Sequence, residues 1–516
     1  MSNPVVSGWT PANIDVNWLL ATPITILVLA GLVAMMVDAF SKKKAYVAGV
    51  ALAGIAASMF ACFRLWDTPA ALAMSFGLKG DAATSQLTAD NYALLLSLII
   101  LAAGALTVIM SLDYLKGQRL MRGEYFILLL FAMSAMILMV QATELITIFL
   151  ALEAFSVSLY VLSAFARKRK RSAEAGLKYL LLGAFSSAFL LYGIALIYGT
   201  LGTTNLLEIN RALASASTVG GDLSRYLLPA GIGMLLVGLG FKVAAVPFHL
   251  WTPDVYEGAP TPITAFMSVA TKAAAFGVMG RVLLFAFPSA RPEWEPIVVA
   301  MAIATMVVGN VVAITQNNVK RLLAYSSIAH AGYLLIAIVA NDSVSLLYYL
   351  MGYAVMNIGA FAVVAHLAHD GREFSDISDF RGLAHRNPLV AVAMTIFMFS
   401  LAGIPFSIGF NAKFVLFLNA VGREYTGLVI LAVLASAVSA FYYLRVVVAM
   451  WMREHDGQTA QAPARMAPGI GAVVTLCAIL ALLGGVVMNP LVGLASHANP
   501  SQAPGVAELP GSVARR

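Results

Sequence analysis

Long apolar runs recur along nearly all of the 516-residue chain, and each is close to the length of a membrane-spanning helix. A helix needs about 20 apolar residues to cross the hydrocarbon core of a bilayer, and about 14 such runs are present. Their centres fall near residues 28, 55, 101, 133, 154, 186, 238, 274, 306, 331, 357, 403, 438 and 478. This pattern predicts an all-α polytopic membrane protein with about 14 transmembrane helices.

The overall composition supports the same fold class and excludes several kinds of protein. Apolar residues make up 60% of the chain and charged residues only 11%, whereas a soluble domain contains about 25% charged residues. A chain this apolar cannot present the polar surface of a soluble enzyme, a nucleic-acid-binding protein or a secreted disulfide scaffold. We therefore expect no nucleic-acid partner.

The sequence lacks the residues that would hold a redox group. Cys62 and Cys477 are its only cysteines, and an iron–sulfur cluster needs about four. Gly231 and Gly233 begin a dinucleotide fingerprint, but Leu236 stands where its third glycine belongs. The sequence thus predicts neither a cofactor site nor a metal site in this chain.

Basic residues indicate how the chain is oriented in the membrane. The first 16 residues contain no Lys or Arg, and the first apolar run is followed by Lys42–Lys44, so we expect that run to remain as an anchor. Loops after odd-numbered helices carry 18 Lys and Arg residues, and the opposite side, tails included, carries 7. By the positive-inside rule, the odd-numbered loops are cytoplasmic and both termini lie on the periplasmic side.

Two of the predicted helices contain helix-breaking residues within their apolar stretch. Glycines and Pro247 interrupt the seventh helix, and Gly403, Pro405 and Gly409 interrupt the twelfth, which covers about residues 387–419. A straight helix of that length would be about 50 Å long, whereas the bilayer core is about 30 Å thick. Paired broken helices indicate a transporter built from inverted repeats.

A repeat of five helices would place the two broken helices in corresponding positions. Because five is an odd number, consecutive units would have opposite orientations in the membrane. The predicted domains are the first three helices (residues 1–122), a first repeat of helices 4–8 (123–290), a second inverted repeat of helices 9–13 (291–455), and the fourteenth helix with the C-terminal tail (456–516).

Three lysines lie deep within apolar stretches. Lys242, Lys272 and Lys413 each cost about 2.5–3.5 kcal/mol at the bilayer centre, and Glu153 adds a carboxylate midway along the fifth helix. One acid cannot pair with three lysines, so some lysines must face water or change protonation state; buried structural ion pairs are the alternative. An ion pair at 4 Å is worth about 4 kcal/mol at an effective dielectric of 20. Moving Glu153 relative to Lys242 would therefore switch that lysine between holding and releasing a proton.

Two histidines and a fourth lysine extend this polar series. His249 follows the proline of the seventh helix, and His330 lies in the apolar tenth helix. Imidazole titrates near neutral pH, so both are candidates for a proton relay, with a hydrogen-bonded core histidine as the alternative. Lys178, near the start of the sixth helix, is a candidate for proton uptake or a side chain that reaches the surface. We expect His366 and His369 to be solvated and to lack a third metal ligand.

Three segments make the chain similar to a known family. Val246–Pro262, Asn318–Tyr333 and Ser400–Pro405 resemble hallmark segments of the antiporter-like membrane subunits of NADH:quinone oxidoreductase, respiratory complex I. Within that family, Glu174–Tyr179 and Gly238–Lys242 most resemble the N branch, the bacterial counterpart of mitochondrial subunit 2. The resemblance covers nearly the whole chain and implies two inverted five-helix repeats, each with a broken helix.

The resemblance also implies roles for the polar residues. The matching positions are Glu153 as the fifth-helix carboxylate, Lys242 as the central pumping lysine, Lys272 as the connecting lysine of the eighth helix, Lys413 as the exit-side lysine of the twelfth, and His249 and His330 on the same path. A lysine in the twelfth helix matches the N and L branches rather than M, and the chain lacks the long lateral helix of L. Ala412 departs from the glycine expected before this lysine.

The function implied by the resemblance is proton translocation as a subunit of NADH:quinone oxidoreductase, a translocase. NADH oxidation and quinone reduction would occur in partner subunits, which would hold NADH, FMN, iron–sulfur clusters and quinone, while this chain would hold no cofactor. The expected partners are the neighbouring antiporter-like M subunit, the small K, J, A and H subunits, and lipids of the bacterial inner membrane. A subunit of a multi-subunit cation/proton antiporter, or of a membrane-bound hydrogenase complex, is the alternative.

Overall fold

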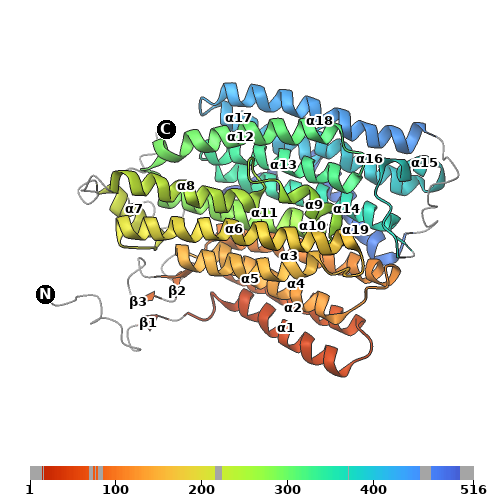
Figure 1. Ribbon diagram of the computed structural model, residues 1–516, viewed down its shortest axis with the longest axis horizontal. Helices are drawn as coiled ribbons and strands as arrows, with labels where there is room; N and C mark the ends of the chain where they lie inside the picture. The colour runs from red at the N-terminus through yellow and green to blue at the C-terminus, as the bar shows by residue number, and fades with distance from the viewer. Residues whose placement is uncertain are drawn as a thin grey trace.

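The computed structural model describes residues 17–68, 85–215, 224–369, 371–453 and 466–499, together with three two-residue strands outside these ranges. The long helices lie side by side with their axes along one common direction, from α1 at one edge to α18 at the other (Figure 1). Thirteen helical segments in the described part of the chain are long and apolar enough to cross a membrane. The chain is therefore a multi-pass membrane protein.

The described residues of the first half of the chain form six long helices and one short helix. Their bounds are α1 (Thr22–Phe40), α2 (Ala45–Leu65), α3 (Asn91–Gly117), α4 (Gly123–Gln141), α5 (Leu145–Ser163), α6 (Lys170–Leu201) and α7 (Leu206–Ala214). Two antiparallel strand pairs are β1 (Ile14–Asp15) with β3 (Gly77–Leu78) and β2 (Met74–Ser75) with β4 (Leu87–Thr88). Strands β1 to β3 lie toward the same end of the molecule as α7 (Figure 1).

The second half contains the remaining spans and several short connecting helices. Their bounds are α8 (Ser224–Val243), α9 (Trp251–Gly258), α12 (Arg291–Ile314), α13 (Val319–Val339), α14 (Ser343–Leu367), η6 (Ile377–Phe380), α15 (Leu383–Arg386), α16 (Pro388–Ala402), α17 (Ile408–Val421), α18 (Thr426–Met452), α19 (Pro468–Val486) and α20 (Asn489–His497). Between α9 and α12 lies a span, residues 261–286, that we call the eighth span.

The eighth span alternates between two kinds of helical hydrogen bonding. Its α-helical parts are α10 (Thr261–Phe266) and α11 (Lys272–Gly280), and its π-helical parts are η4 (Met267–Thr271) and η5 (Arg281–Ala286). Turns of π-helix are rare and are found frequently at functional sites. No sequence pattern predicted them, so they are a feature that only the structure shows.

The predicted spans and both predicted breaks are confirmed. Thirteen spans and the interrupted pair α16–α17, all within the described residues, correspond to the 14 predicted helices. The seventh helix is interrupted after Val243, and the twelfth is interrupted between Ala402 and Ile408. In each break a residue other than glycine takes a positive φ, Ala244 at 61° and Phe406 at 66°. This left-handed conformation turns the chain out of the helical path.

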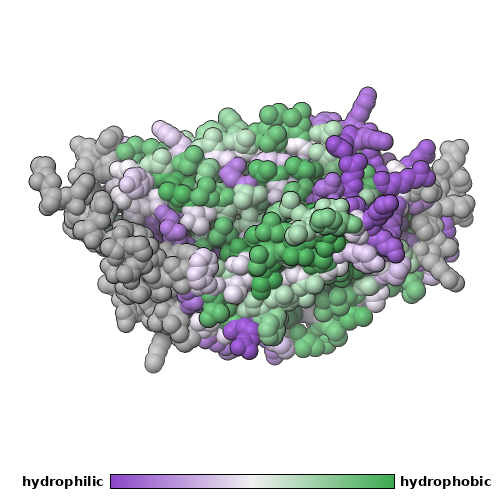
Figure 2. Space-filling model, turned by 90° about the horizontal axis from the view of Figure 1, so that it is seen from below, coloured by the Kyte–Doolittle hydropathy of each residue, from purple (hydrophilic) through white to green (hydrophobic). Residues whose placement is uncertain are grey.

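The spans differ in how much of their surface is buried. The eighth span, α13 and α14 are buried over most of their length, whereas only a minor part of α1 and α19 is buried. A broad hydrophobic surface covers the middle of the face shown in Figure 2, and hydrophilic side chains gather toward one end. Exposed apolar side chains of a membrane protein contact lipid or other subunits, so the enclosed core of the bundle consists of the central spans.

The expectation that His366 is solvated is wrong. Helix α14 continues to Leu367, so His366 lies within its last turn and is 4% exposed. His369 lies just beyond the helix and is partly exposed. The error arose because the apolar run was expected to end before this histidine.

Candidate functional site

Lys242 lies at the end of α8 and is almost completely buried. Its Nζ donates a hydrogen bond to Ser156 Oγ of α5 at 2.7 Å. Four aromatic rings surround the amine with centroids 5.4–5.7 Å from Nζ: Phe155, Tyr160, Tyr179 and Phe241. Such rings stabilise a cation by its attraction to their negative faces. The site can therefore hold a charged amine without placing a carboxylate against it.

Glu153 lies one turn before Ser156 on α5. It is partly exposed, and its carboxylate accepts a hydrogen bond from Ser187 of α6. No ion pair within 4.0 Å joins Glu153 to Lys242 in the described part of the chain. The two side chains thus lie beside the same part of α5 but bond to different partners, Lys242 to Ser156 and Glu153 to Ser187.

Lys272 lies at the junction of η4 and α11, in the middle of the eighth span. Its Nζ donates a hydrogen bond to the backbone oxygen of Ser327 on α13 and lies 5.5 Å from the ring centroid of Tyr353 on α14. The hydroxyl of Tyr353 donates to Ser327 Oγ at 2.8 Å. Among the described residues, this second buried amine is also coordinated by neutral groups only.

His330 lies on α13, one turn beyond Ser327, within a group of tyrosines. Its Nδ1 lies 2.8 Å from the hydroxyl of Tyr349 and its Nε2 lies 3.3 Å from that of Tyr443. The ring of Tyr353, which borders Lys272, lies 5.2 Å from the imidazole. His330 is therefore hydrogen-bonded on both ring nitrogens and adjoins the Lys272 site.

Lys413 lies on α17 and points to the end of the preceding half-helix. Its Nζ donates to the backbone oxygens of Leu401 and Ala402 at 3.0 Å and to Ser436 Oγ of α18 at 2.9 Å. These carbonyls are the last of α16, where the helix dipole attracts a cation. The amine lies 5.2 Å from the ring centroid of Tyr333, whose ring contacts His330. Lys272, His330 and Lys413 therefore form one continuous polar cluster.

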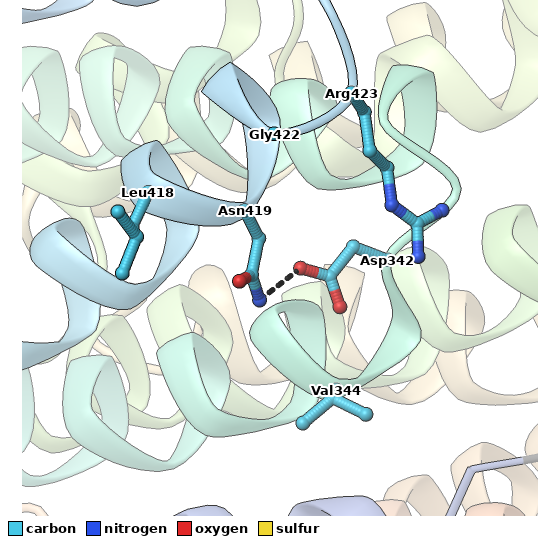
Figure 3. A pocket seen from close by; sticks show the side chains of 6 residues that line it. All are labelled: Asp342, Val344, Leu418, Asn419, Gly422 and Arg423. Carbon is cyan, nitrogen blue, oxygen red and sulfur yellow. Dashed lines mark hydrogen bonds between the residues drawn. The ribbon is translucent and has the colours of Figure 1, made fainter. Parts of the chain in front are cut away.

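A pocket opens at the C-terminal end of α17, the end that lies away from α16. It has a volume of about 430 Å³ and is lined by Asp342, Val344, Leu418, Asn419, Gly422 and Arg423. Asn419 donates to Asp342 Oδ2 at 2.8 Å across the pocket, as Figure 3 shows. Because α17 also carries Lys413, the pocket offers a polar opening at one end of the helix that holds this lysine.

The other two predicted residues, Lys178 and His249, belong neither to the Lys242 site nor to the cluster of Lys272, His330 and Lys413. Lys178 is partly exposed and forms ion pairs of 2.6 Å with Glu174 and Asp254. His249 lies in the break after α8, is buried, and has no hydrogen-bond partner for Nδ1 among the described residues. The structure therefore supports a surface ion pair for Lys178 and leaves His249 with one unpaired ring nitrogen.

Two ion clusters at the ends of the spans could not be identified from the sequence. In one, Asp254 and Glu257 of α9 pair with Lys178, with Arg321 and with Arg171. In the other, Glu373 pairs with Lys320 at 2.9 Å, lies 3.6 Å from Arg169 and accepts a hydrogen bond from Tyr114. Each cluster joins residues far apart in sequence, so periodicity gives no signal for either. Among the described residues, no group of three His, Cys, Asp or Glu side chains could hold a metal ion.

The first of these clusters yields a prediction about pH. Burial opposes the charge on Asp254, but the bonds from Lys178 and Arg321 outweigh it and hold the pKa of this carboxyl below its usual range. A carboxyl with a lowered pKa stabilises the fold above its unfolded-state pKa, and this contribution is lost as the pH falls through the folded-state value. We expect Asp254→Asn to lower the unfolding temperature of the purified complex at pH 7. The difference from the wild type should shrink below about pH 4.

Thermal unfolding measured between pH 7 and about pH 3 checks this expectation. Glu293→Gln on α12 is a matched control, since no ion pair of Glu293 is present in the described part of the chain. An Asp254→Asn difference that stays constant at every pH would contradict the ion-pair explanation.

Comparison with known proteins gives consistent matches. The profile of a family described as NADH:quinone oxidoreductase/Mrp antiporter matches residues 142–439. NADH-quinone oxidoreductase subunit N 1 of Herpetosiphon aurantiacus is 44% identical over 486 residues, covering 93% of this chain and 96% of that protein. A chain of respiratory complex I from Thermus thermophilus with bound aureothin matches with TM-score 0.77 and 33% identity, covering 91% and 98%. A chain of the Mrp complex from Dietzia sp. DQ12-45-1b shares the fold with TM-score 0.80 at 19% identity, covering 94% and 98%.

Proposed function

This chain belongs to the family of NADH:quinone oxidoreductase and Mrp antiporter membrane subunits, and we propose that it serves as the N subunit of a proton-translocating NADH:quinone oxidoreductase. The observation that carries this proposal is a set of three buried lysines inside the membrane spans. In the described part of the chain, Lys242, Lys272 and Lys413 are coordinated by hydroxyls, carbonyls and rings rather than by carboxylates. An amine without a carboxylate partner can take up and release a proton without breaking an ion pair.

In this proposal, protons move from one lysine to the next across the centre of the membrane. Protons from the cytoplasm load Lys242 and Lys272, and the tyrosine group around His330 connects Lys272 with Lys413. Lys413 then releases its proton toward the pocket at the end of α17. His249, with one unpaired ring nitrogen, is a further candidate for the path on the Lys242 side.

Glu153 tunes the Lys242 site and faces a neighbouring subunit in this proposal. Leu150 and Val157, one turn to either side of it on α5, are exposed, so this carboxylate lies at the edge of a lateral apolar face. A carboxylate exposed to lipid is costly, so a partner subunit covers this face. We propose the antiporter-like M subunit and the small K, J, A and H subunits as the partners of the chain.

The two breaks support the proposed repeats. The break after α8 and the break between α16 and α17 both contain a left-handed residue and both lie beside a buried lysine. This correspondence favours two inverted five-helix units, residues 123–290 and 291–455, flanked by residues 1–122 and 456–516. From the distribution of basic residues we propose that both termini lie on the periplasmic side of a bacterial inner membrane.

The redox chemistry belongs to partner subunits in this proposal. NADH, FMN, iron–sulfur clusters and quinone bind there, and the chain contributes only proton transfer to the translocase. Coupling reaches this chain as a change in its spans or in the charge around Glu153.

The experiment that tests the function is deletion of this chain in its native host. We expect NADH oxidation with quinone and NADH-driven proton uptake by inverted membrane vesicles to be lost, while the sodium tolerance of the cells is unchanged. Restoration of both activities by the plasmid-borne gene is the control. Sodium sensitivity with normal NADH oxidation would instead identify a cation/proton antiporter subunit. Co-purification with hydrogenase subunits would identify a subunit of a membrane-bound hydrogenase complex.

A further inference from the structure

One face of the eighth span carries polar side chains at nearly every turn. Thr261, Thr264, Ser268 and Lys272 follow one another at intervals of three or four residues, which places them on the same side of the helix. All four are at most 1% exposed. At 1.5 Å per residue they extend over about 16 Å, from the end of the span to the central lysine.

Helix α14 packs against this face in a matching antiparallel register. The ring of Tyr353 lies 5.5 Å from Lys272 Nζ, and one turn further along α14 Asn357 Nδ2 donates to Ser268 Oγ at 2.5 Å. Each step of four residues along the eighth span is thus matched by a step of four along α14. Ser268 and Lys272 therefore both face α14, with Asn357 beside them.

Asn357 carries an acceptor that the described part of the chain leaves unpaired. The residue is fully buried, and its Oδ1 has no hydrogen-bond partner. An unpaired buried amide oxygen destabilises the fold, and a bridging water would remove that cost. Because Ser268 lies in the π-helical segment η4, this is also the part of the span where the helix is widened.

The polar face begins at Thr261, and this end of it, which we call its outer end, contacts the Glu373 cluster. Thr261 Oγ1 donates to Glu373 Oε1 at 3.3 Å, and the backbone N–H of Thr261 donates to the hydroxyl of Tyr114 at 3.4 Å. Burial opposes the charge on Glu373, but Lys320 and Tyr114 outweigh it and hold the pKa of this carboxyl below its usual range. An ionised acceptor thus stands at the outer end of the polar face.

The polar face is closed between its two ends. Thr264 donates its hydroxyl to the backbone oxygen of Tyr256 at 3.0 Å. Phe361, one turn beyond Asn357 on α14, packs edge-on against the ring of Tyr256 with centroids 6.4 Å apart. Side chains thus fill this level of the polar face, and a change in packing around Phe361 would be needed to admit water.

We propose that this face of the eighth span is a gated proton-uptake path that supplies Lys272 from Glu373, with Asn357 and Ser268 as its inner relay. The proposal rests on the proposed function and names an uptake residue other than Lys178, because Glu373, and not Lys178, bonds to the first residue of the polar face. Asn357 and Ser268 are positioning residues because they act by holding water beside Lys272.

The test replaces Asn357 by Leu and measures NADH-driven proton uptake by inverted vesicles from pH 6 to about pH 9. We expect uptake to fall about tenfold and to fall further as the external pH rises, because proton supply becomes limiting. Asn357→Thr, which keeps a polar group, should restore most of the rate. Ser268→Ala is the milder second variant. Its matched control is Ser97→Ala, another fully buried serine whose hydroxyl bonds to its own helix backbone.

The outcomes separate this path from the function itself. One outcome would overturn the path and leave the function standing. In it, Asn357→Leu and Ser268→Ala both show normal, pH-independent proton uptake, while Lys272→Met loses uptake. Equal loss in Asn357→Leu and Asn357→Thr at every pH would also overturn it, since that result reports damaged packing. Normal uptake in Lys272→Met would contradict the proposed function.

Discussion

Replacement of Lys242 by Met is expected to lower NADH-driven proton uptake by inverted vesicles by about tenfold or more, because positioned proton-transfer groups typically contribute 10²–10⁴-fold to a rate. Quinone-linked NADH oxidation should fall with it, since the two processes are coupled. Methionine is close to lysine in length and apolar, so the pocket formed by the four aromatic rings should remain filled. The loss would therefore report the amine and not a cavity.

Two further variants show which property of the amine matters. Lys242→Arg keeps a positive charge among the rings but does not release a proton, because guanidinium stays charged in proteins. We expect it to be as inactive as Lys242→Met. Lys116→Met, which changes an exposed lysine at the end of α3, should be fully active.

Assembly is checked by NADH oxidation with an artificial acceptor, which should persist in every variant. Full pumping by Lys242→Arg would contradict proton transfer through Lys242 and would favour a fixed charge with a structural role. Normal proton uptake and oxidation in Lys242→Met, combined with sodium sensitivity, would favour the antiporter alternative.

The spans and their breaks were predictable because lipid imposes a simple rule on sequence. A membrane-spanning stretch such as Thr22–Phe40 has to be predominantly apolar, and a helix-breaking residue such as Pro405 stands out within such a stretch. The depth of Lys242 and Lys413 was predictable for the same reason, since a charge inside an apolar run is rare and costly.

The partners of these lysines were not predictable from the sequence. Ser156, which bonds to Lys242, is one of several serines on α5, and nothing in the spacing distinguishes it. The contact between Asn357 and Ser268 depends on the register of two antiparallel helices 89 residues apart in sequence. The backbone carbonyls that accept hydrogen bonds from Lys413 are available only because α16 stops at Ala402. Tertiary packing decides these contacts, and a hydropathy pattern carries no information on them.

The variant Glu153→Gln should remove most proton uptake while leaving assembly normal. Glutamine keeps the size of the side chain and can still accept the hydrogen bond of Ser187, so only the charge is lost. That charge lies at the edge of the lateral face of α5, where a neighbouring subunit can act on it. We expect uptake to fall about tenfold, measured as for Lys242. Glu144→Gln, at the start of the same helix and bonded to Thr204, is the matched control and should remain active.

A double variant decides whether Glu153 acts through Lys242. In the described part of the chain the two residues form no hydrogen bond or ion pair with each other, so an effect of Glu153 on proton transfer has to pass through the Lys242 site or through a partner subunit. If it passes through Lys242, adding Glu153→Gln to Lys242→Met should cause no further loss, because coupled residues are not additive. A multiplied loss would place Glu153 on a separate route across the lateral face. Normal pumping in the single Glu153→Gln variant would discard its role altogether.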